Sequence, residues 1–245
     1  MKQNSALSKT IVALDNLSPA EVDFFLKKAN GRIPTIKIGL ELFCLKGIDF
    51  VKKIYDTYNL DIFLDLKLHD IPNTVKKAIS SLKSVPIKFL TIHLAGGREM
   101  VSFAIEEAKI SLPGTNLLGV SYLTSLGEND FLELFDCKKS DIKFRFKNLF
   151  LLAMESNIQG VVLSANELDI VKSIENQFNK KIIKVTPGIR FNDEINSNQI
   201  QDQKRVETPE SAIEKGADYL VIGRPLTMAN DLDKRILELS FANNH

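Results

Sequence analysis

The 245-residue sequence predicts an α/β fold in which strands and helices alternate along the chain. Eight short β-type runs follow one another at fairly even spacing, with segments of helical character between them, so that one strand–helix unit takes about 30 residues. No Pro/Gly/Ser-rich linker or shift in composition divides the chain. We therefore predict a single (β/α)₈ TIM barrel domain over residues 1–245, with a doubly wound sheet as the alternative fold.

The strands are predicted from short runs rich in β-branched, aliphatic and aromatic residues. In chain order they are 11–15, 35–39, 61–67, 89–94, 116–123, 160–165, 182–189 and 219–224. Local signals mark three of the helices between them. Ser18 is a helix cap before residues 19–30, Pro72 precedes a helical segment at 73–84, and residues 98–110 carry apolar side chains three and four positions apart.

The balance of charges bears on the class of partner. The chain has 32 Lys and Arg residues against 31 Asp and Glu residues, so no overall field favours nucleic acid or an anionic membrane. The N-terminus lacks the apolar run of a signal peptide, and the longest apolar stretches, such as 149–154, are too short to span a bilayer. We expect a cytoplasmic protein that binds a small molecule or another protein. Cys44 and Cys137 indicate neither a disulfide framework nor a zinc site.

Ionisable side chains fall on the predicted inner face of three consecutive strands. Along 61–68, one face is entirely aliphatic and must pack on helices, whereas the other carries two charged residues near the carboxyl end of the strand. Buried charges persist only if they neutralise one another or serve a ligand. We predict an alternating ionic network, with a purely structural network as the alternative. Its members are Asp15, Lys37, Asp65 and Lys67, with Asp70 just beyond the third strand.

Other polar residues lie at the ends of strands four and five. His93 is expected to point inward, where a lone histidine is more often a core or hydrogen-bonding residue than a ligand. The 3 histidines of the chain show no metal-motif spacing, so we expect no metal site. Ser121 and Thr124 are candidates to contact a polar ligand, the alternative being hydrogen bonds to the local backbone.

The last two strands end in glycine–arginine pairs. Gly188 and Arg190 lie at the end of strand seven, and Gly223 and Arg224 lie at the end of strand eight. The loops at these positions form the recurrent phosphate site of (β/α)₈ barrels, because glycine lets backbone N–H groups approach and arginine donates forked hydrogen bonds. We therefore predict a phosphorylated ligand.

A longer motif joins these features. The pattern D-x-K-x-x-D-I-P-x-T at 65–74 resembles the signature of the orotidine 5′-phosphate decarboxylase family, most closely in its bacterial branch. Further matching segments follow the family's order: ALD at 13–15, KIGLELF at 37–43, HLAGG at 93–97, YLTS at 122–125, TPGIR at 186–190 and IGRPLT at 222–227. The resemblance covers about residues 10–230.

The resemblance implies a homodimer that converts orotidine 5′-monophosphate to UMP and CO₂, the last step of de novo pyrimidine biosynthesis, without metal or organic cofactor. It implies substrate contacts from Asp15 and Lys37 to the ribose hydroxyls, from Thr124 to the pyrimidine edge, and from Arg190, Gln203, Gly223 and Arg224 to the phosphate. The implied catalytic set is Asp65, Lys67 and Asp70, and Asp70 reaches with Ile71 and Thr74 into the partner subunit's site. The loop at about 190–207 resembles the family's phosphate-gripping lid.

The chemistry of this reaction explains the need for a fixed cation. Loss of CO₂ leaves an electron pair on C6 of the ring that no neighbouring carbonyl can fully delocalise, so the site must stabilise a carbanion electrostatically. The ammonium group of Lys67, flanked by carboxylates, is predicted to stabilise this charge and then to protonate the carbon. Two alternatives stay open: a metal-dependent sugar-phosphate decarboxylase or epimerase on the same barrel, and a non-catalytic nucleotide-binding barrel.

Overall fold

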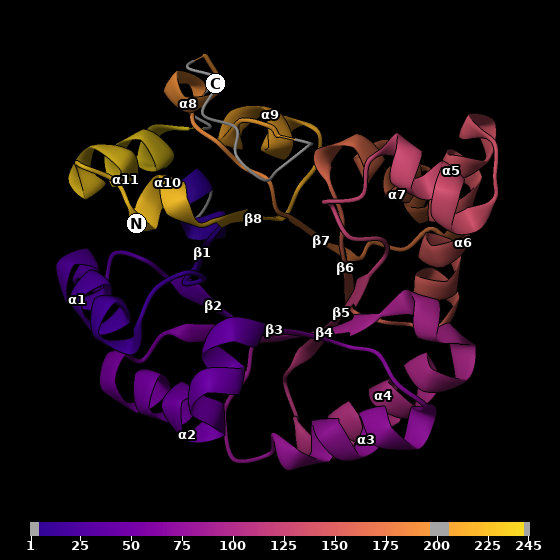
Figure 1. Cartoon of the computed structure of the whole chain (residues 1–245), viewed down its shortest axis with the longest axis horizontal. Helices are drawn as coiled ribbons and strands as arrows, with labels where there is room; N and C mark the ends of the chain where they lie inside the picture. Colours follow the sequence, from indigo (N-terminus) through magenta and orange to yellow (C-terminus); the bar gives the residue numbers. More distant parts are fainter. Residues whose placement is uncertain (1–4, 197–205, 243–245) are drawn as a thin grey trace.

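The computed structural model describes residues 5–196 and 206–242, and within them eight parallel strands close into a barrel in sequence order (Figure 1). The strands are β1 (Thr10–Ala13), β2 (Thr35–Gly39), β3 (Asp61–Leu68), β4 (Phe89–His93), β5 (Asn116–Val120), β6 (Gly160–Val162), β7 (Ile183–Thr186) and β8 (Tyr219–Ile222). β1 pairs with both β2 and β8, which completes the ring. The closed order confirms the predicted (β/α)₈ TIM barrel, since a doubly wound sheet is open at its edges.

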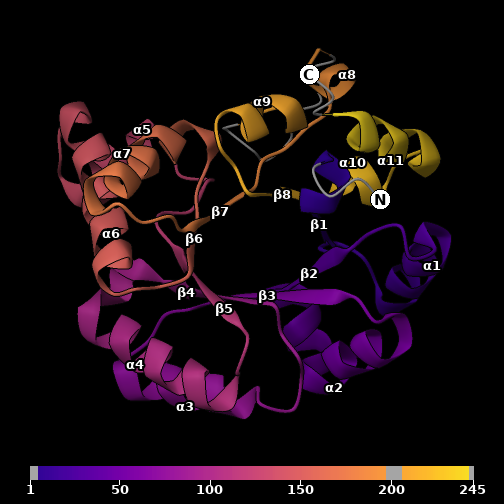
Figure 2. The same ribbon diagram turned by 180° about the vertical axis from the view of Figure 1, so that it is seen from behind.

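Helices surround the strands as an outer ring (Figures 1 and 2). The α-helices are α1 (Pro19–Ala29), α2 (Leu40–Tyr58), α3 (Pro72–Ser81), α4 (Gly97–Ser111), α5 (Glu128–Phe135), α6 (Lys139–Glu155), α7 (Leu168–Phe178), α8 (Asn192–Asn196), α9 (Pro209–Glu214), α10 (Arg224–Thr227) and α11 (Leu232–Phe241). Three short 3₁₀ turns are also described: η1 (Ala6–Lys9), η2 (Leu94–Gly96) and η3 (Ala165–Glu167). None of the helices in the described ranges is long and apolar enough to cross a membrane.

The three helices predicted from local signals, α1, α3 and α4, are all present. At the start of α1, the hydroxyl of Ser18 accepts a hydrogen bond from the backbone N–H of Glu21, and the Glu21 carboxylate accepts one from the N–H of Ser18. This reciprocal pair satisfies N–H groups that the first turn of a helix leaves unbonded. α3 begins at Pro72, where the missing N–H of proline removes no helical hydrogen bond.

Six of the eight strands end before the predicted carboxyl end, and the difference is largest in β5, β6 and β7. β5, β6 and β7 end at Val120, Val162 and Thr186, and the apolar residues that follow them continue into loops. The long connection between β5 and α6 contains α5, and the predicted lid loop at about 190–207 contains α8, although residues 197–205 lie outside the described part of the chain. Apolar composition alone did not mark these strand ends, because buried loops beside a cavity are as apolar as strands.

The core has two layers that follow the alternation of side chains along each strand. Inside the barrel, Phe63 and Phe89 meet edge to face with ring centroids 5.9 Å apart. They pack in one cluster with Ile11, Ala13, Leu118, Val185 and Val221. Outside it, Ile62 and Leu64 join the much larger layer between strands and helices. Ala13, Phe63 and Val221 of the inner cluster also line a cavity at the carboxyl end of the barrel, beside polar side chains.

A separate buried ionic cluster lies at the other end of the barrel, where β7 begins. The ammonium group of Lys184 lies 2.9 Å from Glu175 Oε1 and 3.0 Å from Asp218 Oδ2, and the Glu175 side chain is only 1% exposed. Burial alone would raise the pKa of Glu175, but hydrogen bonds from the Ile182 N–H and from lysine ammonium groups hold it below its usual range. Because its members satisfy one another, we interpret this cluster as structural.

Candidate active site

A cavity of about 310 Å³ opens at the carboxyl ends of the strands. Its apolar wall is formed by Phe63, Val120, Val162 and Val221, which offer a surface for a flat ring. The predicted site residues that line it come from both sides of the barrel. They are Asp15, Lys37, Asp65, Lys67, Thr124, Arg190, Gly223 and Arg224.

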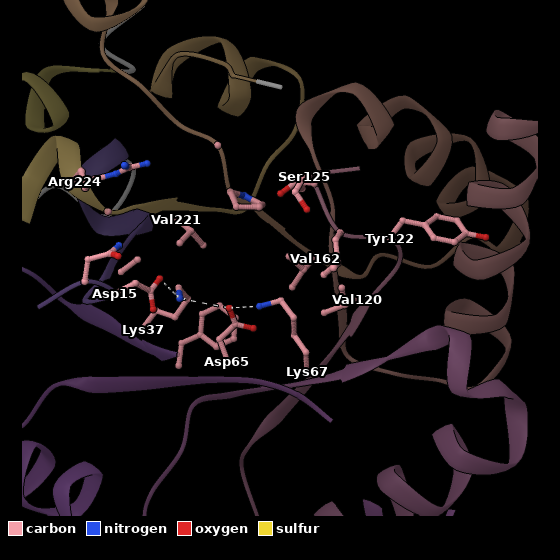
Figure 3. A pocket seen from close by; sticks show the side chains of 18 of the residues that line it. Asp15, Lys37, Asp65, Lys67, Val120, Tyr122, Ser125, Val162, Val221 and Arg224 are labelled. Atoms are coloured by element: carbon pink, nitrogen blue, oxygen red, sulfur yellow. Dashed lines mark hydrogen bonds and ion pairs between the residues drawn. The ribbon is translucent and has the colours of Figure 1, made fainter. Parts of the chain in front are cut away.

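Four of these side chains form a continuous chain of alternating charge (Figure 3). Lys37 Nζ lies 2.6 Å from Asp15 Oδ2 and 3.5 Å from Asp65 Oδ2. Lys67 Nζ lies 2.7 Å from the same Asp65 oxygen. The structure therefore brings together Asp15, Lys37, Asp65 and Lys67 of the predicted ionic network, but not its further member Asp70. All four side chains line the cavity, so a ligand that enters it can reach them.

The end of β2 has no room for a side chain beside this network. A Cβ atom on Gly39 would lie 2.4 Å from Asp15 Oδ1 and 3.2 Å from Lys37 Nζ. Glycine at this position therefore lets the Asp15 carboxylate approach Lys37 closely enough for a direct ion pair. The family motif KIGLELF contains this glycine, but its steric role follows only from the packing.

Asp65 is the buried centre of the network, with 8% of its surface exposed. Burial by itself would raise the pKa of its carboxyl group, but the ammonium groups of Lys37 and Lys67 and the hydroxyl of Thr91 together hold that pKa below its usual range. Asp65 is therefore an anion at neutral pH. The Lys67 side chain is more exposed, at 31%, and its ammonium group extends from Asp65 into the cavity.

The far end of the cavity contains both glycine–arginine pairs. Gly188 and Arg190 follow β7, Gly223 and Arg224 follow β8, and all four residues line the same space. The backbone N–H of Arg190 donates to the carbonyl oxygen of Glu207, which joins the two ends of the 190–207 connection. The predicted phosphate ligands thus line the same cavity as the ionic network, and Arg224 lies on the Asp15 side of that network, away from Lys67 (Figure 3). Gln203, the remaining one, lies outside the described residues.

The loop after β5 contributes Thr124, as predicted, and also Ser125, which the sequence reasoning missed. The YLTS motif, which ends in this serine, was the available signal. Ser121, the other predicted hydroxyl of this segment, is buried and does not line the cavity. The ring of Tyr122 points away from the cavity (Figure 3) and packs edge to face against rings from the neighbouring helices, with the Phe131 centroid 4.8 Å away. This aromatic packing fixes the start of the loop.

Three predicted residues do not line the cavity of their own chain: Asp70, Ile71 and Thr74. Asp70 is exposed and accepts a hydrogen bond of 2.7 Å from the backbone N–H of Ile71. Ile71 is 67% exposed, which is unusual for a large aliphatic side chain. Among the described ion pairs, Lys67 contacts Asp65 and not Asp70. The second carboxylate predicted to flank Lys67 is therefore absent from the contacts of a single chain.

His93 packs against His69, with ring centroids 5.1 Å apart, at the edge of the charged network. Burial, followed by the charges of His69 and Lys67, lowers the pKa of His93 from 6.5 to about 4. The imidazole is therefore neutral at neutral pH. Among the described residues, no three His, Cys, Asp or Glu side chains are grouped so that they could hold a metal ion.

We expect His93 to make the protein less stable in mild acid. Its folded pKa lies below the unfolded value, so the unfolded chain takes up the proton first and the free energy of unfolding falls as pH drops from about 6.5 to about 4. Urea unfolding at pH 7 and pH 5 measures this loss, and a His93→Gln protein should lose less over the same interval. Equal losses in the two proteins would refute the assignment. His69→Gln should show an intermediate loss, because it removes the His69 charge but leaves the burial that lowers the pKa of His93 most.

Comparisons with known proteins agree with this geometry. Residues 8–238 match the model of a family described as Orotidine 5'-phosphate decarboxylase / HUMPS family. The chain is 43% identical over 221 residues to orotidine 5'-phosphate decarboxylase of Ehrlichia canis (strain Jake), a match that covers 90% of this chain and 91% of that relative. It is 38% identical over 228 residues to the protein of the same name from Listeria monocytogenes serovar 1/2a, covering 92% and 94% of the two chains.

Solved structures give the same result. The crystal structure of orotidine 5'-phosphate decarboxylase from Lactobacillus acidophilus superposes with a TM-score of 0.78 at 31% identity, covering 96% of this chain and 99% of that one. An uncharacterized conserved protein from Geobacillus kaustophilus gives a TM-score of 0.79 at 33% identity, with coverage of 96% and 100%. The matches extend over nearly the whole chain and include the charged signature at 65–74. The resemblance predicted from that signature is confirmed, and the chain belongs to the orotidine 5'-phosphate decarboxylase / HUMPS family.

Proposed function

We propose that this protein decarboxylates orotidine 5′-monophosphate to UMP and CO₂, the last step of de novo pyrimidine biosynthesis, and that it does so in the cytoplasm. The observation that carries the proposal is the alternating chain from Asp15 to Lys67 inside a cavity with two arginines at its far end. Relatives that carry the name orotidine 5'-phosphate decarboxylase at 37–43% identity support it. We expect the reaction to need no metal or organic cofactor.

The proposed binding mode uses the two ends of the cavity. Arg190, Arg224 and the backbone at Gly223 bind the phosphate, and the 190–207 connection, including Gln203, closes over it as a lid. Asp15 and Lys37 bind the ribose hydroxyls. The ring lies against the apolar wall, with its polar edge at Thr124 and its carboxylate toward the network. Binding energy from the phosphate can then orient the base, so the arginines contribute to turnover as well as to affinity.

In the proposed chemical step, the bond between C6 and the carboxylate breaks and CO₂ leaves. The electron pair stays on C6, where the ammonium group of Lys67 stabilises it electrostatically and then donates a proton to form the C6–H bond of UMP. Lys67 regains its proton from water. Asp65 holds the ammonium group in place before the substrate arrives, so little reorganisation is left for the reaction itself.

The proposal includes a homodimer with shared sites. Asp70, Ile71 and Thr74 are exposed on one chain and do not line its cavity. Large apolar side chains are exposed at the carboxyl ends of the adjacent strands β2 and β3, with Leu40 at 51% and Ile71 at 67%. A second copy of the chain would cover this apolar surface. It would also bring Asp70 beside the partner's Lys67 as the second flanking carboxylate.

The first test is an absorbance assay. Purified protein is mixed with orotidine 5′-monophosphate in EDTA, and loss of the ultraviolet absorbance of the orotate ring is followed. We expect rapid loss that persists at any EDTA concentration. A folded protein that causes no loss would overturn the proposal, and activity on sugar phosphates that requires an added divalent ion would replace it with the alternative sugar-phosphate chemistry. Tight UMP binding without turnover would instead support a non-catalytic nucleotide-binding barrel.

A further inference from the structure

β3 departs from regular pairing at the point where it enters the active site. It pairs with β4 at Phe63↔Phe89 and Leu64↔Leu90, and pairing resumes only at Leu68↔Ile92. Residues 65–67 of β3 therefore lie opposite a single residue of β4, Thr91. A bulge of this kind interrupts the ladder of backbone hydrogen bonds and redirects side chains. Here the interrupted stretch contains both Asp65 and Lys67.

The backbone of Lys67 is unusual within this bulge. Its φ is +47°, in the left-handed region, where side chains other than those of Asn and Asp are rare. The other non-glycine residues with positive φ in the described part of the chain are all Asn or Asp. Such a conformation persists only if surrounding contacts hold it. The contacts that hold Lys67 therefore decide where its ammonium group lies.

Thr91 supplies these contacts. Its hydroxyl oxygen accepts a hydrogen bond of 2.8 Å from the backbone N–H of Lys67, which the bulge has removed from the strand ladder. The same hydroxyl donates a hydrogen bond of 2.9 Å to Oδ1 of Asp65. Thr91 is completely buried and does not line the cavity. The Thr91 side chain thus joins the backbone of Lys67 to the carboxylate of Asp65, two of the predicted catalytic residues.

The two carboxylate oxygens of Asp65 have different hydrogen-bond partners. Oδ1 accepts from the Thr91 hydroxyl, whereas Oδ2 accepts from Lys67 and lies 3.5 Å from Lys37. The carboxylate is therefore fixed in rotation, and the oxygen that faces the cavity side is the one that holds the lysines. Without the Thr91 hydroxyl, the Asp65 carboxylate could rotate, and the half-buried N–H of Lys67 would lose its hydrogen-bond partner.

We propose that Thr91 is a positioning residue for the decarboxylation, acting through Asp65 and Lys67 rather than on the substrate. This inference rests on the proposed function. Displacing Lys67 by a fraction of its distance to C6 weakens both carbanion stabilisation and proton transfer. The phosphate and ribose contacts come from other strands and stay in place. Loss of Thr91 should therefore lower kcat and leave ligand affinity nearly unchanged.

The test compares kcat, KM and UMP affinity in wild type, Thr91→Val and Thr91→Ser. Valine keeps the shape and removes both hydrogen bonds, and kcat should fall about 10- to 100-fold while KM and the Kd for UMP change less than about threefold. Serine keeps the hydroxyl and should restore kcat to within about threefold of wild type. Thr91→Ala is measured alongside, and the same loss is expected from whichever of the two hydroxyl-free proteins folds.

The matched control is Thr10→Val. Thr10 is also a fully buried strand threonine, and its hydroxyl donates a 2.8 Å hydrogen bond to the carbonyl oxygen of Ala6, away from the cavity. This variant should lose stability but keep kcat. If wild type is active and Thr91→Val has an unchanged kcat, or loses kcat and UMP affinity equally, the role of Thr91 is refuted. The proposed function would not be affected by that result. A wild type without decarboxylase activity would overturn the proposed function and this inference with it.

Discussion

Replacing Lys67 by alanine is expected to lower the rate of decarboxylation by at least about 10⁴-fold, because one ammonium group is assigned both carbanion stabilisation and proton donation. Each role alone accounts for a loss of about 10²-fold or more. The variant should still bind UMP, since the residues proposed to bind the phosphate and the ribose hydroxyls are other residues that line the cavity. Removing Lys67 leaves Asp65 with Lys37 as a counter-ion, so the protein should fold.

The measurement is the loss of orotate absorbance in EDTA, with UMP affinity determined by titration. Lys143→Ala, which removes an exposed lysine on α6, is the control and should retain wild-type activity. Retention of more than about one hundredth of the wild-type rate by Lys67→Ala would remove Lys67 from the chemical step. Retained UMP binding beside lost turnover separates a catalytic role from a general loss of structure.

Mixing two inactive proteins, Lys67→Ala and Asp70→Ala, is expected to restore activity. If Asp70 completes the partner's site, a mixed dimer has one site in which both substituted residues occur and one site with intact Lys67 and Asp70. Random exchange makes about half of the dimers mixed, each with one intact site of two, so recovery should approach about one quarter of wild-type activity. The assay is the same absorbance change after subunit exchange.

The informative control is a mixture of Lys67→Ala with Asp65→Ala. Both side chains come from one chain, since Asp65 and Lys67 form a direct 2.7 Å ion pair within β3. Every site in that mixed dimer lacks one of them, so no recovery is expected. No recovery in the Lys67→Ala and Asp70→Ala mixture, with exchange verified by labelled subunits, would refute the shared site. Equal recovery in both mixtures would contradict the assignment of Asp65 and Lys67 to one site.

Local sequence patterns were sufficient for the architecture and for most of the cavity. Alternation along β2 and β3 correctly separated the helix-facing aliphatic residues from Lys37 and Asp65, because side chains on a strand must point to opposite faces. The glycine–arginine ends of β7 and β8 line the cavity because all strands of a parallel barrel end on one face. Strand alternation depends only on residues close together in the sequence, and the position of the strand ends depends only on the rule that parallel barrel strands end on one face.

The sequence by itself therefore determined the barrel, the family and the charged residues of its inner face. Only the tertiary structure decided that three residues of β3 lie opposite Thr91, that Lys67 takes a positive φ, and that Asp70 does not line the cavity of its own chain. The physical reason is that register, bulges and burial result from packing between strands distant in sequence. Phe63 and Phe89 bring β3 and β4 together, and the hydroxyl of Thr91 then satisfies a backbone N–H that no local pattern marks as unpaired.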